Sequence, residues 1–245
     1  YYHRLYWICQ KAKKAAKEER ALPPRARGCK EDFIARFEEL VLSGRFSPGD
    51  RLPPERDLAE SLGASRPVVH AALGELASRG LLRIESRKGV FVSDWKKEGS
   101  IEILLSLMSY SGDEISPAFL ESMLEMRLLF ETETARLAAQ RRTGAQMDEI
   151  EKVVARERLL EDRQGHGVTL LDYDFHLAVA IASGNEVYPL IMNSMRRIYH
   201  RILDRFYADP SVVPEVFRLH RALARAIAEG RAEDASGTMR DILVY

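Results

Sequence analysis

Three side chains in the C-terminal half of the sequence have the types and spacing that a metal site needs. Asp172 and His176 lie four residues apart in the amphipathic segment LLDYDFHLAVAIASGN, so in a helix they project from the same face. His220 begins another amphipathic segment, LHRALARAIAEG. A mixed oxygen and imidazole set suits zinc, nickel, manganese or iron better than calcium. The same pattern is compatible with an exposed Asp/His pair or a hydrogen-bonded histidine, so both interpretations stay open.

A second set of residues, in the N-terminal part, has the chemistry of DNA recognition. Arg56 lies in one short helical pattern, Ser65 and Arg66 open the next, and Arg87 and Lys88 lie between two strand-like segments. The guanidinium fork of arginine can pair with guanine in the major groove or with a phosphate. The alternative is a small helical domain with ordinary surface arginines.

The elements that must position these basic residues are predicted to form a winged helix-turn-helix. One helix begins near Glu31, and a second follows in PERDLAESLG. Ser65 is the expected N-cap of a third helix, RPVVHAALGELASRG, which has a proline in its first turn. LLRIE and VFVSD then flank SRKG, a pattern that predicts a β-hairpin with a basic tip. The residues of the third helix predicted to face inward are Val68, Ala72, Leu73 and Leu76.

The chain has 245 residues, which favours two domains at roughly 150 residues each. We predict a basic arm over 1–27, the winged helix-turn-helix over 28–95, a linker over 96–99 and a helical bundle over 100–245. The fold class is therefore mainly α. The helical segments expected in the second domain are roughly 100–110, 117–139, 144–162, 168–183, 187–207, 213–229 and 231–243.

The net charge of zero conceals two parts of opposite charge. Residues 1–97 contain 20 Lys and Arg and 13 Asp and Glu, whereas residues 98–245 contain 17 Lys and Arg and 24 Asp and Glu. A basic part joined to an acidic part suggests a polyanion-binding module, although two surfaces that differ by chance would look the same. Every apolar stretch is too short to span a membrane, and the two cysteines support no disulfide framework. We expect a cytoplasmic protein without a membrane partner.

The stretch PGDRLPPERDLAESLGASRPVVHAALGELASRGLLRIESRKGVFV resembles the DNA-binding domain of the GntR family of bacterial transcriptional regulators. One position departs from the family pattern, because His70 stands where a second arginine is usual. A neutral imidazole cannot make the bidentate guanine contact, so the operator is expected to differ from the family's common one. The resemblance and the third helix together give as DNA-binding residues Arg56, Ser65, Arg66, His70, Arg87, Lys88 and Gly89.

Residues 100–245 resemble, more weakly, the effector-binding FCD domain of the FadR-like branch of that family. The resemblance runs through LEMRLLFETETARLAA, DYDFHLAVAIASGN and HRALARAIAEGRAEDASGTM. It implies an all-helical bundle, often with a metal ion held by one aspartate and three histidines. Asp172, His176 and His220 match three of these ligands, whereas the fourth position holds Ile242.

The apolar Ile242 leaves three interpretations of the site. Three protein ligands can hold a zinc, nickel or manganese ion with an open fourth position; His200 or another residue can substitute; or the pocket binds its effector without metal, with Asp172 and His176 paired to each other. The resemblance also matches Arg127 to an arginine that lines the pocket, where it would pair with a carboxylate effector. The alternative for Arg127 is an i,i+4 partner of Glu131 on a helix surface.

The preferred interpretation is a ligand-responsive transcriptional repressor that binds operator DNA as a homodimer and senses a small carboxylate. Two half-sites one helical turn apart multiply the affinity of a single module. One alternative is an acyl-coenzyme A-responsive regulator with no metal. Another is a metal-dependent hydrolase fused to a DNA-targeting domain, and a third is a constitutive architectural DNA binder. The sequence has no HExxH motif and no Gly-rich phosphate loop, so we expect no enzyme activity.

Overall fold

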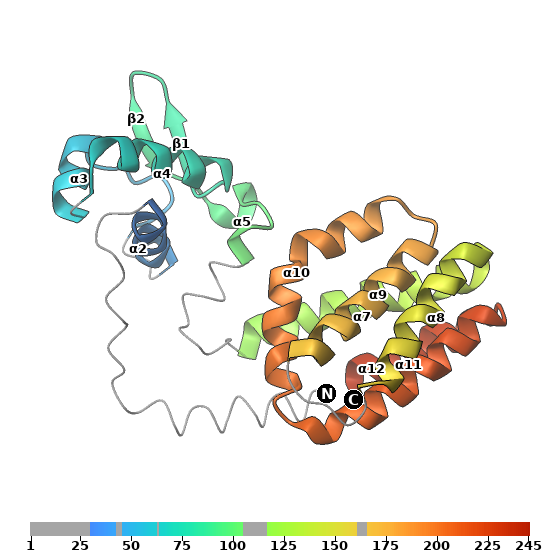
Figure 1. The fold of residues 1–245 in the computed structure, drawn as a ribbon. Helices are drawn as coiled ribbons and strands as arrows, with labels where there is room; N and C mark the ends of the chain where they lie inside the picture. Colours follow the sequence, from blue (N-terminus) through green and yellow to red (C-terminus); the bar gives the residue numbers. More distant parts are fainter. Residues whose placement is uncertain (1–29, 43–45, 63, 105–116, 161–165) are drawn as a thin grey trace. The chain divides into compact units, whose positions relative to one another are not determined.

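The computed structural model describes residues 30–42, 46–62, 64–104, 117–160 and 166–245, which form two compact units (Figure 1). The predicted arm over 1–27 and the predicted helix over 100–110 beyond residue 104 lie outside the described residues. The predicted domain limits therefore remain a prediction, and each unit is described by itself.

The first unit has the predicted order of three helices followed by a hairpin (Figure 1). The two strands pair antiparallel, with Leu82 opposite Val92 and Glu85 opposite Gly89. The elements are α2 (Lys30–Leu42), α3 (Glu55–Leu62), α4 (Arg66–Ser78), β1 (Leu82–Glu85), β2 (Gly89–Val92) and a short α5 (Trp95–Glu98). Their apolar side chains form one core, which includes Phe33, Phe37, Leu58, Val69, Ala72, Leu73, Leu76, Leu82 and Val92.

Two details of α4 differ from the prediction. Val69 is buried at 0% exposure and Val68 is only partly buried, so the inward-facing stripe is displaced by one residue at its start. The buried positions 69, 72, 73 and 76 have the i, i+3, i+4, i+7 spacing of a regular helix face, whereas position 68 lies off that face. Ser65 occupies the N-cap with an extended backbone, but its side chain makes no capping hydrogen bond.

Helix α5 covers most of the segment predicted as a linker, and it packs on the first unit. Ile103 belongs to the core of this unit, and Trp95 packs against it. The backbone N–H of Ser100 donates to the carbonyl of Arg79 at 2.9 Å. Gly80 makes this approach possible, because its φ is +77° and a Cβ at this position would collide with the carbonyl of Glu98.

The second unit is a bundle of six α-helices in the described residues, joined in part by a 3-10 turn. Thr143 and Gln146 form a capping box at the start of α8. No helix in the described ranges has the length and apolar character needed to cross a bilayer. The elements are α7 (Pro117–Arg141), α8 (Gly144–Arg158), α9 (His166–Ala182), α10 (Val187–Phe206), η1 (Pro210–Val212), α11 (Val213–Ala228) and α12 (Ala232–Val244), close to the predicted segments.

Gly80→Ala is expected to destabilise the first unit by about 2 kcal/mol or more, because alanine is strained at this φ and its methyl group displaces α5. The control is Gly74→Ala in α4, where a Cβ meets nothing within 4 Å; this change should stabilise by about 0.5–1 kcal/mol. Urea unfolding followed by Trp95 fluorescence, in a Trp7→Phe background, measures both. Equal effects of the two variants would contradict the assigned role of Gly80.

Candidate functional site

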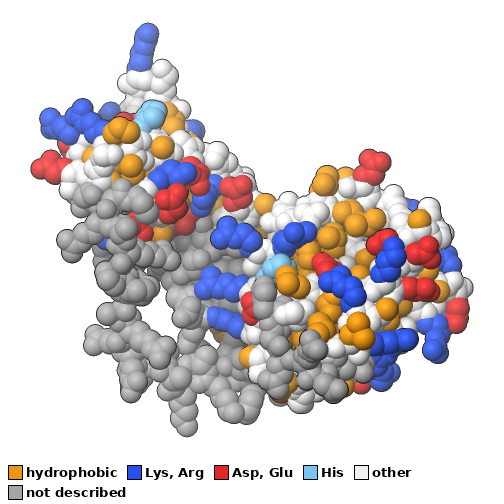
Figure 2. All heavy atoms as spheres, viewed as in Figure 1, with side chains coloured by type: hydrophobic (Ala, Val, Ile, Leu, Met, Phe, Trp, Pro, Cys, Tyr) orange, Lys and Arg blue, Asp and Glu red, His pale blue; other side chains and the backbone are white. Residues whose placement is uncertain are grey.

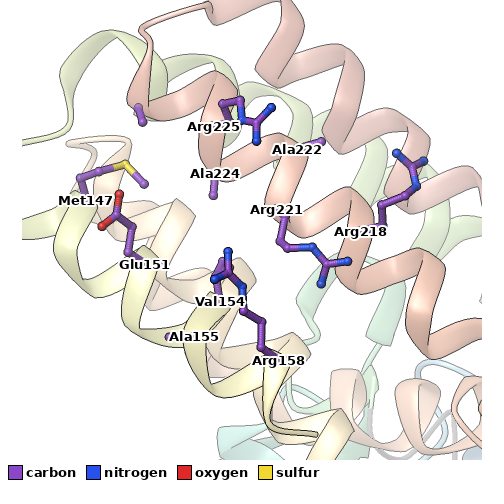
Figure 3. A pocket seen from close by; sticks show the side chains of 11 residues that line it. Met147, Glu151, Val154, Ala155, Arg158, Arg218, Arg221, Ala222, Ala224 and Arg225 are labelled. Atoms are coloured by element: carbon purple, nitrogen blue, oxygen red, sulfur yellow. The ribbon is translucent and has the colours of Figure 1, made fainter. Parts of the chain in front are cut away.

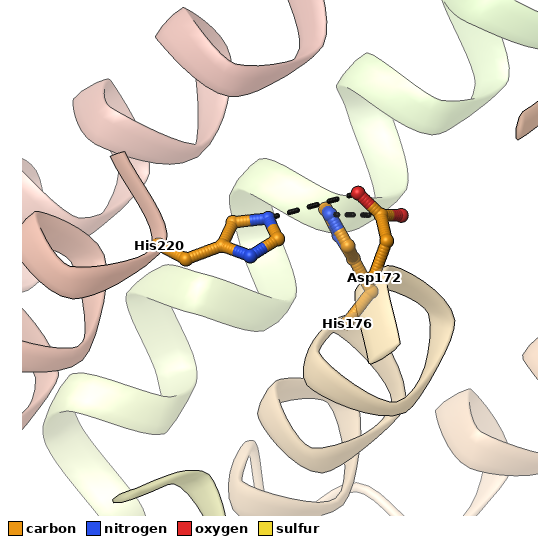
Figure 4. Close-up of side chains that lie close together, drawn as sticks. All are labelled: Asp172, His176 and His220. Carbon is orange, nitrogen blue, oxygen red and sulfur yellow. Dashed lines mark ion pairs between the residues drawn. The ribbon is translucent and has the colours of Figure 1, made fainter. Parts of the chain in front are cut away.

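The structure brings together the three predicted metal ligands inside the second unit. Asp172 and His176 come from α9, and His220 comes from α11 (Figure 4). One ligand atom from each lies within 4.8 Å of the other two. All three side chains are buried, with relative exposures of 3%, 2% and 0%. The four-residue spacing in α9 thus places both side chains on one face of the helix, close to His220 of α11.

Each imidazole is oriented by a buried carboxylate on its far side. The Nδ1 of His220 lies 2.6 Å from an oxygen of Glu157, and the Nδ1 of His176 contacts an oxygen of Glu131. With its Nδ1 proton donated to Glu157, His220 has the lone pair of its Nε2 directed toward Asp172. For His176 the contact with Glu131 is a close ion pair that does not have hydrogen-bond geometry. The Nε2 atoms of His176 and His220 lie 3.9 and 3.8 Å from the two Asp172 oxygens. Carboxylates in this position fix the tautomer and orientation of metal-binding histidines.

Three buried atoms at the centre of this cluster have no hydrogen-bond partner among the described residues: Asp172 Oδ1, His176 Nε2 and His220 Nε2. Leaving such atoms unsatisfied is costly, and a cation between them would satisfy all three. The other oxygen of Asp172 accepts a hydrogen bond of 2.6 Å from the Tyr207 hydroxyl. The donor set of one carboxylate and two imidazoles therefore fits a divalent transition metal.

The predicted fourth position faces the same place. Ile242 lines a small cavity together with Asp172 and His176, and the volume of about 10 Å³ is roughly that of one water molecule. His200 is outside the cluster and packs edge-on against Tyr173, with ring centroids 5.1 Å apart. Asp172 and His176 are too far apart for a direct hydrogen bond, at 3.9 Å. Two details of the three interpretations are therefore not found in the described residues, namely a ligand from His200 and a direct Asp172–His176 hydrogen bond.

Arg127 belongs to a buried network beside the cluster. Its Nε donates to Glu131 Oε1 at 2.6 Å, as the i,i+4 spacing predicts, but the pair is buried rather than on a helix surface. The guanidinium lies over the ring of Tyr199 at 4.6 Å, and the Tyr199 hydroxyl donates to Glu131 at 2.5 Å. Arg127 also lines the small cavity.

The network keeps Glu131 charged in spite of its burial. Burial raises the pKa of the Glu131 carboxyl, but Arg127 and His176 outweigh it and hold this pKa well below its usual range. For His176, burial lowers the pKa and the charges of Glu131 and Asp172 raise it, with a net rise. Burial and the neighbouring Glu131 raise the pKa of Tyr199 well above its ordinary value. The hydroxyl of Tyr199 therefore remains a hydrogen-bond donor.

The predicted DNA-binding residues lie on the surface of the first unit. Arg56 pairs with its neighbour Asp57 and is 73% exposed in its side chain. Arg66 is exposed at the start of α4, and one turn later His70 is 78% exposed, with Nδ1 2.9 Å from Glu55. The pairing with Glu55 involves Nδ1 of His70, so Nε2 is the ring nitrogen that could contact a base.

The hairpin turn presents the remaining predicted contacts. Arg87 has a φ of 64° and Gly89 a φ of +123°, which makes the turn tight, and a basic side chain projects from its tip (Figure 2). Lys88 is 73% exposed and pairs with Glu85. Sequence reasoning missed Arg51. Its guanidinium packs against Gly89 in the hairpin, so closely that a Cβ on Gly89 would lie 3.0 Å from it.

Sequence reasoning also missed that Glu131 and Glu157 orient the two imidazoles. The sequence offered one signal, because Glu131 is four residues after Arg127. Glu157 and Tyr207 gave no signal, since each reaches the cluster from a different helix end and only the packing of the bundle reveals them.

Comparisons with known proteins agree with these observations. Residues 30–92 match the bacterial regulatory proteins of the gntR family, and residues 122–244 match the FCD domain. The fatty acid metabolism regulator protein of Enterobacter sp. (strain 638) is 29% identical over 213 residues, covering 87% of this chain and 85% of the relative. Its Escherichia coli counterpart is 28% identical over the same lengths.

A solved structure with a TM-score above 0.5 has a similar fold. Lar, which controls expression of the Listeria monocytogenes agr system, is 15% identical with a TM-score of 0.52, covering 90% of this chain and 95% of that chain. A Streptococcus agalactiae GntR protein is 26% identical with a TM-score of 0.48, covering 88% of this chain and 97% of that chain.

Arg127→Met is expected to destabilise the helical unit by about 3–5 kcal/mol, because it leaves the Glu131 charge buried without its main partner. The matched control on the same helix is Arg136→Met, which removes a solvent-screened pair with Glu133 and should have a much smaller effect. Thermal unfolding by circular dichroism compares the two variants. Similar losses would mean that the buried network contributes nothing beyond an ordinary surface pair.

Proposed function

The chain belongs to the GntR family of bacterial regulatory proteins with an FCD domain, and from this premise we propose how its two units work together. It is a ligand-responsive, DNA-binding transcriptional regulator rather than an enzyme. We propose that it represses transcription from an operator and senses a small carboxylate at the buried Asp172, His176 and His220 cluster. The three unsatisfied ligand atoms are the observation that carries this proposal.

A zinc, nickel or manganese ion would be held by Asp172, His176 and His220. When bound, such an ion supplies a Lewis-acid centre with an open position for a carboxylate oxygen. The chain's own residues prepare the site, since Glu131 and Glu157 hold the imidazoles and Tyr207 holds the aspartate. Arg127, on the wall of the same cavity, provides a guanidinium for the other carboxylate oxygen.

The size of the cavity connects ligand binding to a change in shape. A volume of about 10 Å³ is too small even for a small organic acid, so binding requires the apolar wall to move. That wall consists of Leu203 and Phe206 from α10, Val216 from α11, and Ile242 and Leu243 from α12. A ligand that binds only the opened arrangement shifts the population toward it, which is what a regulator needs.

We propose a homodimer formed through the helical unit. Large exposed apolar side chains include Leu129 at 80% on α7, and Leu190 at 63% and Val187 at 55% on α10. Phe130 and Tyr188 stack edge-on, so these parts of α7 and α10 are neighbours, and hydrophobic side chains gather on the visible face of this unit (Figure 2). A two-fold pair of such faces would present two DNA-binding units to two half-sites.

An acyl-coenzyme A effector without metal is the second candidate, and it is in line with the names of the relatives, which describe regulators of fatty acid metabolism. An acyl chain, like a small carboxylate, would fit only after the apolar wall has moved, and it would require a larger displacement of that wall. The three unsatisfied ligand atoms favour the candidate with a metal. The metal content of the protein separates the two candidates.

Protein purified without a histidine tag is expected to carry about one transition-metal ion per subunit, and a chelator should lower its melting temperature by mass action. His176→Ala should abolish both effects, and Ile242→His should tighten metal binding, because residue 242 lines the cavity. His200→Ala is the control, since His200 lies outside the cluster. Elemental analysis decides: a metal content near zero that zinc, nickel and manganese cannot restore would exclude the metal site.

Arg66→Ala should weaken operator binding by about 1–3 kcal/mol and relax discrimination at one position per half-site, because Arg66 opens the exposed face of α4. His70→Arg should shift the preferred operator toward a guanine-containing site. Titration against operator and scrambled DNA at fixed salt measures the affinity of Arg66→Ala. Selection from a random DNA library measures the operator preference of His70→Arg. Arg136→Ala, in the helical unit, is the control for lost charge; unchanged operator affinity of Arg66→Ala would remove α4 as the recognition helix.

A further inference from the structure

A groove with a volume of about 690 Å³ lies between α8 and α11 on the helical unit, apart from the cluster of Asp172, His176 and His220. Its floor is apolar and includes Met147, Val154 and Ala224. Four arginines line it: Arg158 comes from α8, and Arg218, Arg221 and Arg225 come from α11. Arg158 and Arg221 extend from the two helices into the space between them (Figure 3).

The charge of this groove is opposite to that of the part of the chain that contains it. Residues 98–245 carry 17 basic against 24 acidic residues, yet four arginines and only one acidic residue, Glu151, line the groove. Glu215 pairs with Arg218 at 2.7 Å. Arg158 and Arg225 line the groove without an ion pair to another of the described residues. The residues that line the groove therefore carry more positive than negative charge.

Three of the four arginines are aligned on α11. Arg218, Arg221 and Arg225 are spaced i, i+3 and i+7, so they form one stripe along the same helix face. Like charges at these spacings repel and destabilise a helix. A bound polyanion would turn this repulsion into attraction, because guanidinium groups bind phosphate oxygens in bidentate pairs.

We propose that this groove binds a small organic phosphate, with its phosphate groups against the arginines and its organic part on the apolar floor. The volume lies within the range of about 300–1,000 Å³ that small-molecule sites occupy. The concave shape and the apolar floor distinguish it from a surface for a DNA backbone, which would need only exposed charge.

The groove lies between the same two helices, α8 and α11, that carry Glu157 and His220. Arg158 and Arg221 directly follow Glu157 and His220 in the sequence, and these two residues form the hydrogen bond of 2.6 Å that joins α8 to α11. A phosphate that bridges Arg158 and Arg221 would hold the same pair of helices from their outer side.

The test is isothermal titration calorimetry of the full-length protein with pyrophosphate, at an ionic strength held constant with sodium chloride. We expect saturable binding that Arg158→Gln and Arg225→Gln each weaken about tenfold, because each removes charged hydrogen bonds. The control is Arg156→Gln, which removes an exposed arginine two residues from Arg158 that pairs with Asp174 and does not line the groove. This variant should bind pyrophosphate as tightly as the wild type.

Further arms identify the source of the phosphate and the outcomes that overturn the proposal. Tighter binding of ADP than of fructose 1,6-bisphosphate indicates a nucleotide, and the reverse indicates a sugar phosphate. Absence of pyrophosphate binding at matched ionic strength overturns the proposal, as does equal weakening by Arg156→Gln. It is also overturned if the groove variants weaken only binding to non-specific DNA. None of these outcomes depends on a metal at Asp172, so they are independent of the proposed effector site.

Discussion

The helical unit depends on the pairing of charges that it removes from water. Arg127 and Glu131 are 3% and 1% exposed, and burial of either one alone would be strongly unfavourable. Arg127 and Glu131 lie one turn apart on α7, while Tyr199 approaches from α10 and His176 from α9. The helices α7, α9 and α10 must therefore pack at the level where these side chains form their ion pairs and hydrogen bonds. The same packing brings the two imidazoles of the cluster to Asp172, so the local order of the site follows from the pairing of charge.

Much of the architecture could be predicted because it has local causes. The helices of both units follow from apolar periodicity and from boundaries such as Pro67 and Thr143, and the hairpin follows from its strand-like flanks and basic turn. Asp172 and His176 share a face because their spacing in a helix requires it. In each case the information lies within about one helical turn or one hairpin of sequence.

The features that escaped prediction have causes far apart in the sequence. Glu157 meets His220 across 63 residues, and Tyr207 meets Asp172 across 35 residues. No periodicity records such a meeting, since it depends on how α8, α10 and α11 rotate when the bundle packs. The docking of α5 depends similarly on Gly80, whose role is visible only when the carbonyl of Glu98 is in place. A glycine at a helix end looks like an ordinary cap in the sequence.

The burial of the cluster has a consequence for time rather than for affinity. Asp172, His176 and His220 are no more than 3% exposed, and the adjoining cavity holds about one water molecule. An ion or a small molecule can enter or leave only while the helices separate, so exchange proceeds at the rate of that opening and not at the rate of diffusion. The occupancy of such a site therefore follows the ligand concentration averaged over the lifetime of the closed state. It does not respond to concentration changes that are faster than this lifetime.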